Sequence, residues 1–150
     1  MKREITIFDI AKTFLTFESM TNKKLQKLCY YAQAWYLTLK EGTPLADVDF
    51  EAWVHGPVCP ELYHFYKDWG FQYINKSEEV PEEIQKNKEI YDFIEKIYEI
   101  YGDMDGDELE ALTHNESPWI NGRNGLKRME RSRNIISRED MINFCSNILK

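Results

Sequence analysis

The sequence predicts a mainly α-helical fold with one short β-strand or hairpin, because three local signals agree. Apolar residues recur at helical spacing in several separate segments. Residues that cap helices stand just before most of these segments, and glycine or proline marks most of their boundaries. Strict alternation of apolar and polar residues, which is typical of a strand, is clear in a single segment. With 150 residues, 43% of them hydrophobic, the chain has the size of one domain with a substantial core.

Two helices are predicted before this alternating segment. Thr6 opens a capping box in front of an amphipathic segment, which predicts a helix over about residues 7–17. A longer helix, capped by Thr21 or Asn22, is expected to run to about Lys40. Apolar residues cover most of the circumference of this second helix, so we expect it to be central and to be packed by several neighbours.

The strand follows the central helix. Apolar and polar residues alternate from Val48 to His55, with the period of two that a half-buried strand requires. Gly56 and Pro57 interrupt the alternation, and Val58 is expected to pair back as a short return strand.

The remainder of the chain is again predicted to be helical. The expected helices cover about residues 60–70, 81–101, 105–113 and 137–149, with one additional turn at 117–120 and a connector at 71–80. These elements give about six helices in all, and we expect them to form one compact domain over residues 1–150.

Composition restricts the possible partners and the compartment. A net charge of -7 disfavours nucleic acid and anionic membranes as partners, because both attract basic proteins. No apolar stretch approaches the ~20 residues of a membrane helix, and no signal-peptide pattern is present. The three cysteines are odd in number and widely spaced, which indicates buried free thiols in a reducing compartment. We therefore expect a cytoplasmic protein that enters no membrane.

A metal site is the first chemical alternative to consider. His55, Cys59 and His64 are close in sequence, and zinc prefers such ligands. However, Cys59 and His64 lie across a predicted helix start, and no paired ligand motif supports them. We interpret these residues as ordinary partly buried side chains and predict no metal or other cofactor.

A catalytic site is the second alternative. His114, Asn115 and Glu116 could supply a base and a residue that orients it. Neighbouring residues rarely point together, and we expect instead that Thr113 and His114 cap a helix end. Because no motif of a hydrolase, metalloprotease or nucleotide-binding loop occurs either, we predict that the protein is not an enzyme.

Three separated segments, in this order, resemble the motifs of the Panacea antitoxin family, which includes phage-associated GepA-like proteins. They are residues 24–35 (KLQKLCYYAQAW), residues 50–58 (FEAWVHGPV) with Pro60 and Tyr63 after them, and residues 112–119 (LTHNESPW). The resemblance extends from about Ile7 to Leu149. The residues that carry its structural motif are Leu25, Leu28, Tyr31, Trp35, Gly56, Pro57, His114, Pro118 and Trp119.

The resemblance implies an antitoxin that binds and neutralises a protein toxin encoded beside it. It does not identify the toxin, since members of the family pair with many unrelated toxins. The alternative is a phage- or mobile-element-encoded adaptor protein that binds a host factor. A homodimer is compatible with either function.

Candidate toxin-binding residues come from two segments. They are Trp53, His55, Tyr63, Arg123, Lys127, Arg128 and Arg131. Trp53 lies on the polar side of the alternating strand, so that both a core and a surface position are open, whereas Trp119 is expected in the core.

A basic stretch follows the third motif. It comprises Arg123, Lys127, Arg128, Arg131, Arg133 and Arg138, with Glu130 as its only acid. We interpret it first as a solvated connector, second as a contact for an acidic toxin face and third as a DNA contact. The stretch contains no aromatic residue that could stack on bases, so nucleic acid is the least favoured partner.

Overall fold

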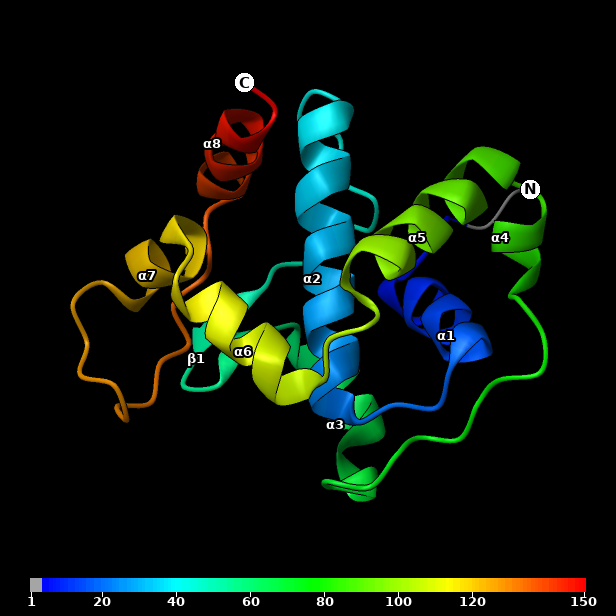
Figure 1. The fold of residues 1–150 in the computed structure, drawn as a ribbon, viewed down its shortest axis with the longest axis horizontal. Coiled ribbons are helices and arrows are strands. Elements are labelled where there is room, and N and C mark those ends of the chain that lie inside the picture. The colour runs from blue at the N-terminus through cyan, green and yellow to red at the C-terminus, as the bar shows by residue number, and fades with distance from the viewer. Residues whose placement is uncertain (1–3) are drawn as a thin grey trace.

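The computed structural model describes residues 4–150, so residues 1–3 of the predicted domain lie outside the described residues. A long central helix, α2 (Asn22–Leu39), runs between two groups of elements (Figure 1). Helices α1 (Ile7–Phe17), α4 (Glu82–Gln85) and α5 (Lys88–Tyr101) lie on one side of α2. Helices α6 (Gly106–His114), α7 (Ser117–Arg123) and α8 (Arg138–Ile148) lie on the other, together with the hairpin. The predicted mainly helical fold and its central helix are confirmed.

The sequence signals for helix starts agree with the structure. Thr6 and Asp9 form the predicted capping box, in which Asp9 Oδ2 accepts from Thr6 N at 2.9 Å. Asp105 and Glu108 form a second capping box at the start of α6. The side chain of Thr21 caps α2 by accepting from the backbone N–H of Lys24.

The predicted hairpin is confirmed, but its first strand is shorter than expected. Strands β1 (Glu51–Trp53) and β2 (Gly56–Val58) pair antiparallel, with Ala52 opposite Pro57. Residues 48–50 precede the strand and residues 54–55 form the turn, although the alternation predicted a strand from Val48 to His55.

The segment before β1 has its polar groups satisfied by a side chain of α2 instead of a neighbouring strand. Gln33 Nε2 donates to Ala46 O at 2.7 Å, and Gln33 Oε1 accepts from Leu45 N at 2.9 Å. On the outer edge of β1, Ala52 N donates to Asn134 O at 2.8 Å, so the chain before α8 covers that edge.

The residues described by the structure form eight α-helices, where the sequence predicted about six. Helix α3 (Pro60–Tyr66) continues into a 3-10 turn (Lys67–Trp69), which together match the predicted helix 60–70. The continuous helix predicted over 81–101 is wrong, because Asn87 separates α4 from α5. The Asn87 side chain accepts from the backbone N–H of Ile90 and so begins a new helix. The additional turn predicted at 117–120 is the helix α7.

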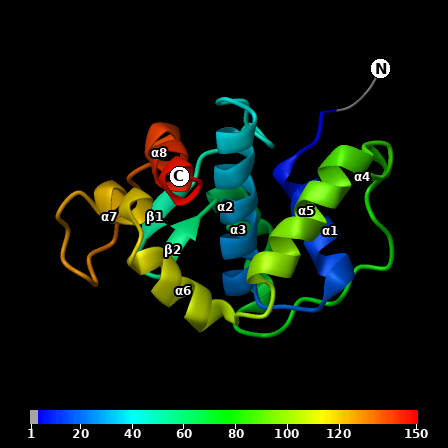
Figure 2. The same ribbon diagram turned by 45° about the horizontal axis from the view of Figure 1, so that its top comes forward.

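One hydrophobic core joins all these elements. It contains residues from α1, α2, β1, α3, α5 and α8, among them Phe14, Leu25, Ala52, Leu62, Ile94 and Met141. The three cysteines are buried and free, as predicted. Among the described residues, no helix combines the length and the hydropathy that crossing a bilayer requires. Figure 2 shows the loop between α7 and α8 projecting from the outer side of the domain.

Candidate functional site

The amino-terminal half of α2, the hairpin and α6 meet at Gly56. This residue has a φ of +112°, a conformation that favours glycine. A Cβ atom at this position would lie 2.8 Å from Lys27 Cε and 3.1 Å from Thr113 Oγ1. Glycine therefore allows the hairpin to approach the side chains of α2 and α6 this closely, and the three motif segments are brought together here.

Lys27 lies beneath the hairpin with only 1% of its surface exposed. No hydrogen bond or ion pair joins its ammonium group to any other of residues 4–150. Burial, together with repulsion by Lys23, lowers the pKa of Lys27 to about 7, against the attraction by Glu110. The junction thus holds a lysine whose charged form is disfavoured.

Amide side chains of α2 hold the second strand and the start of α3. Gln26 Oε1 accepts from the backbone N–H of Cys59 at 3.0 Å, and Gln26 Nε2 donates to Asn22 Oδ1 at 3.0 Å. Asn22 Nδ2 in turn donates to Tyr63 O at 3.3 Å. These contacts fix the position of Tyr63, one of the predicted binding residues.

The third motif forms an aromatic stack beside the hairpin. The ring centroids of His114 and Trp119 are 3.9 Å apart, with 14° between their planes. Trp119 Nε1 donates to Trp53 O at 2.8 Å, and Trp119 is buried, so its predicted core position is confirmed. Thr113 Oγ1 donates to Glu110 O in the last turn of α6, whereas the His114 ring is used for stacking.

Arg123 is buried, with 4% of its surface exposed, so the interpretation of the whole basic stretch as solvated is wrong at this residue. Its guanidinium group donates to the backbone carbonyls of Ala52, Lys127, Arg128 and Glu130, at distances between 2.6 and 3.4 Å. It also lies over the Trp119 ring, 5.5 Å from the centroid. Arg123 therefore holds the loop after α7 against β1.

The other cations of the stretch differ from Arg123. The exposed ones are Lys127, Arg128, Arg131 and Arg133. Arg138 is half-buried at the start of α8, where it binds Asp47 Oδ1 at 3.2 Å and Val48 O at 3.1 Å. The predicted solvated connector is thus present, but the buried Arg123 before it holds its backbone in place.

The hairpin carries the aromatic candidates. Trp53 is half-buried, so its exposure is intermediate between the core position and the surface position that the sequence left open. Its ring packs edge-on against Tyr63, with centroids 5.0 Å apart, and its Nε1 donates to Glu51 Oε1 at 2.9 Å. His55 is exposed at the turn, with Nδ1 3.2 Å from Glu110 Oε1.

The three residues of the metal alternative lie in different environments. Cys59 is buried, and burial raises the pKa of its thiol to about 11, which disfavours the thiolate that binds zinc. His55 and His64 are exposed. In the described part of the chain, no group of three His, Cys, Asp or Glu residues is placed to hold a metal ion.

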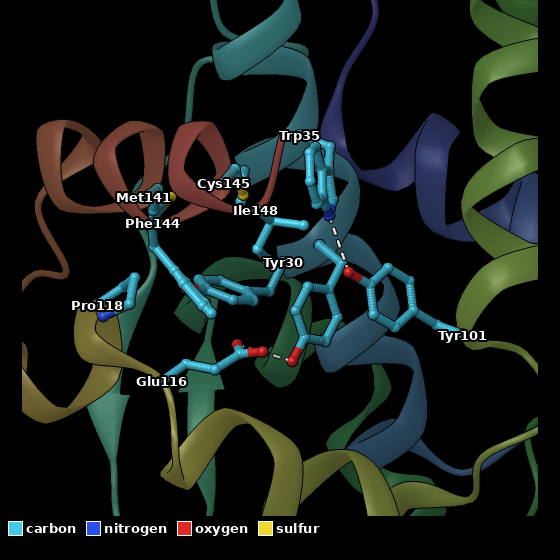
Figure 3. A pocket seen from close by; sticks show the side chains of 11 residues that line it. Tyr30, Trp35, Tyr101, Glu116, Pro118, Met141, Phe144, Cys145 and Ile148 are labelled. Atoms are coloured by element: carbon cyan, nitrogen blue, oxygen red, sulfur yellow. Dashed lines mark hydrogen bonds between the residues drawn. The ribbon is translucent and has the colours of Figure 1, made fainter. Parts of the chain in front are cut away.

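Glu116 faces a small pocket between α2 and α8 that aromatic residues line (Figure 3). Tyr31 Oη donates to Glu116 Oε1 at 2.9 Å, and the Tyr31 ring stacks on Tyr101 with centroids 4.0 Å apart. Trp35 Nε1 donates to Tyr101 Oη at 2.8 Å. Burial raises the pKa of Glu116 to about 7, against the hydrogen bond from Tyr31.

This arrangement separates the members of the catalytic alternative. Glu116 bonds Tyr31, whereas His114 stacks on Trp119, and within residues 4–150 no hydrogen bond connects the two. Asn115 Nδ2 donates to the carbonyl of Ala111 and so belongs to the helix end. Proton transfer would require hydrogen-bond contact between base and orienting residue, which this geometry does not provide.

The residues of the structural motif share a position in the interior. All nine are buried or half-buried: Leu25, Leu28, Tyr31, Trp35, Gly56, Pro57, His114, Pro118 and Trp119. Sequence reasoning missed Lys27 and Gln26, which contact the hairpin directly. The signal that could have identified them is the presence of a lysine and a glutamine within a helix that is apolar on most sides.

Known proteins resemble this chain in the region just described. Residues 25–120, which include all three motifs, match the family described as "Antitoxin SocA-like, Panacea domain". This match covers a shorter range than the resemblance over 7–149 predicted from the motifs. Antitoxin SocA of Caulobacter vibrioides (strain NA1000 / CB15N) is 32% identical in an alignment of 112 residues that covers 67% of this chain and 58% of that protein. No solved structure matches the chain.

Proposed function

Because the chain belongs to the Panacea-domain family of SocA-like antitoxins, we propose that it binds and neutralises a protein toxin encoded beside it. The similar Antitoxin SocA supports this proposal, although the aligned region spans little more than half of that protein. Neutralisation requires only that the bound chain blocks the working surface of the toxin. Such a role demands a well-ordered binding surface and no chemistry of its own.

One observation carries the proposal: the three motif segments converge on the hairpin and hold it in place, and Arg123, just after the third motif, ties the loop after α7 to it. Lys27 and Thr113 pack under Gly56, and Arg123 binds Ala52 together with the loop carbonyls. A surface that is ordered before binding loses less entropy when the partner arrives. The shared motifs therefore support a domain that presents the hairpin to a partner, and Arg123 places the loop beside it.

We propose that the contact residues on this surface come from both segments. The hairpin and α3 supply Trp53, His55 and Tyr63, and the loop supplies Lys127, Arg128 and Arg131. Aromatic and arginine side chains are enriched among the residues that dominate binding energy. Arg123 contributes indirectly by holding the loop, because its guanidinium group is buried.

Co-expression tests the proposal. Each gene product neighbouring this gene is expressed alone and together with the tagged chain, and growth is scored before the tag is used for purification. We expect one neighbour to stop growth, and we expect the chain to restore growth and to form a stoichiometric complex with it. Light scattering on the free chain and on the complex then shows whether either contains a homodimer.

If no neighbour is toxic and none forms a complex, the antitoxin proposal fails. That outcome would favour the alternative of a phage- or mobile-element-encoded adaptor for a host factor. Fractionation of cells that carry the natural gene tests the cytoplasmic location that we also propose.

A further inference from the structure

A groove lies between α7 and the loop that follows it, with a volume of about 390 Å³. We call it the α7 groove. The side chains that line it are His114, Trp119, Ile120, Arg123, Leu126 and Arg128. Ile120 is 48% exposed, so the groove offers an apolar wall to the solvent.

The groove contains a buried polar atom without a well-formed hydrogen bond. His114 Nε2 is inaccessible to water and is the one buried side-chain nitrogen or oxygen among residues 4–150 without a hydrogen bond of good geometry, although the backbone of Val54 lies close enough to the ring to raise its pKa. Folded proteins rarely leave such a group unpaired, since its lost hydration is not replaced.

The loop after α7 supplies Leu126 and Arg128 to the groove, and we call this loop the rim; it is basic. Lys127, Arg128, Arg131 and Arg133 are exposed, and none of them makes an ion pair with another part of the described chain. This concentration of unpaired positive charge occurs on a protein whose net charge is -7.

The electrostatic environment of His114 also includes these cations. Burial lowers its pKa, and repulsion by Lys27 and by Arg128 acts in the same direction, whereas attraction by Glu110 and a hydrogen bond with the backbone of Val54 oppose this. The groove therefore combines an apolar wall with nearby cations that make no ion pair with any acid of residues 4–150.

The groove is formed in the free protein. Arg123 donates to the carbonyls of Lys127, Arg128 and Glu130 and holds the loop against β1. Glu130 Oε1 accepts from the backbone N–H of Lys127 and closes a turn in the same loop. A binding surface with these constraints is not a freely moving connector.

We propose that the α7 groove binds an acidic segment of the protein partner. An apolar side chain of this segment packs against Trp119, Ile120 and Leu126, and flanking carboxylates meet Lys127, Arg128 and Arg131. The inference rests on the proposed antitoxin function for the identity of the partner as a toxin, but the chemistry of the groove does not depend on that identity.

Nucleic acid fits the groove less well than an acidic protein segment. Bases bind to exposed aromatic faces. Here His114 stacks on Trp119, and Arg123 lies over the same ring, so Trp119 offers little free face. The exposed loop itself carries no aromatic side chain.

A titration followed by ¹⁵N NMR tests the inference without any toxin. The probe is a short capped peptide with a central leucine flanked by glutamates. Two further peptides replace either the glutamates by lysines or the leucine by serine. We expect the first peptide to shift the Trp119 indole signal and the amides of Ile120 and Leu126 in a saturable way. We expect much weaker shifts from the other two.

Two charge-matched variants identify the contact. Reversal of the rim in K127E/R128E/R131E is expected to weaken binding of the acidic peptide at least about tenfold. Reversal of exposed lysines elsewhere in K12E/K67E/K76E changes the net charge equally and is expected to leave affinity within about twofold. All six residues are exposed, and unchanged spectra outside the mutated segments confirm folding.

Three results would overturn the inference: no saturable shift at the groove, equal shifts with the lysine peptide, or unchanged affinity after rim reversal. Tighter, strongly salt-dependent binding of a duplex or single-stranded oligonucleotide at the same signals would assign the groove to nucleic acid instead. Since no toxin takes part, failure of the antitoxin proposal leaves this test intact, and the reverse also holds.

Discussion

The two sides of α2 differ in the acceptors that they offer to a buried lysine, as two lysines one turn apart show. Lys24 is 7% exposed, and its ammonium group donates to Glu18 Oε1 at 2.7 Å and to Gly102 O at 2.6 Å, on the side of α5. Lys27 is 1% exposed, faces the hairpin, and has no such acceptor among the described residues. The same residue type on one helix thus has protein acceptors on one side and none on the other.

This difference indicates on which side of the molecule function, and not stability alone, determines the buried residues. His114 at the end of α6 and the half-buried Glu116 just before α7, whose pKa is raised to about 7, belong to the same group of elements as the hairpin that Lys27 faces. Uncompensated polar groups lower stability, and natural proteins keep them mainly at functional sites. The side of α1 and α5 resembles an ordinary core, whereas the hairpin side is the binding surface that we propose.

The largest expected effect comes from Arg123, the cation on the hairpin side that is fully satisfied. Arg123→Ala leaves buried carbonyls of β1 and of the loop without donors, so we expect a loss of about 2–4 kcal/mol in the free energy of unfolding. Chemical denaturation measures it, and hydrogen exchange of residues 127–130 should accelerate. The exposed Arg131→Ala serves as control, with a change of about 0.5 kcal/mol or less. A small effect of Arg123→Ala would show that the loop does not depend on it.

The lysine pair provides the most direct comparison of the two sides. Lys24→Met should destabilise the protein by about 1–3 kcal/mol at pH 7, because Gly102 O loses its donor and Glu18 loses its cation. Lys27→Met should stabilise it by about 1–3 kcal/mol, because a buried charge without acceptors is replaced by an apolar chain of similar size. Changes of the same sign for both variants would contradict the comparison.

The gain from Lys27→Met should depend on pH in a defined direction. The pKa of Lys27 is about 7 in the folded protein, against 10.5 for a lysine fully exposed to water, so the folded state binds fewer protons between these values. The destabilisation caused by Lys27 is therefore complete below pH 7 and disappears as the pH rises towards 10.5. Unfolding of both proteins at several pH values in this range measures the difference.

A smaller effect is expected at Glu116. Its pKa is raised from 4.5 to about 7, so the folded state retains a proton that the unfolded state has released. In the wild type, the contribution of Glu116 to the free energy of unfolding is fully present below about pH 4.5 and is lost as the pH rises through 7. Glu116→Gln keeps an acceptor for Tyr31 and should be more stable than wild type by about 1–2 kcal/mol above pH 7. A constant difference between pH 4 and pH 8 would contradict the assignment.

Local signals explain how much of the fold could be predicted. Capping boxes at Thr6 and Asp105 and the Gly56–Pro57 turn depend on residues close in sequence, and the structure has each of them in place. The break at Asn87 was missed because asparagine is tolerated within helices, and only its bond to Ile90 N reveals a cap.

The candidate site was less predictable, because its contacts join distant segments. The burial of Arg123 depends on carbonyls of β1, 71 residues away, as well as on its own loop. The environment of Lys27 depends on Gly56 and Thr113, which only the folded chain places beside it. Sequence patterns identified the motif segments and the basic stretch, but could not show which cation is buried.

Hydrogen–deuterium exchange on the chain, alone and in complex with the toxin found by co-expression, tests the central claim most directly. We predict that binding slows exchange in residues 53–63 and 120–131, and leaves α1 and α5 unchanged. Slowed exchange confined to α1, α4 and α5 would place the partner on the opposite side of α2 and contradict the assignment of the hairpin side as the binding surface.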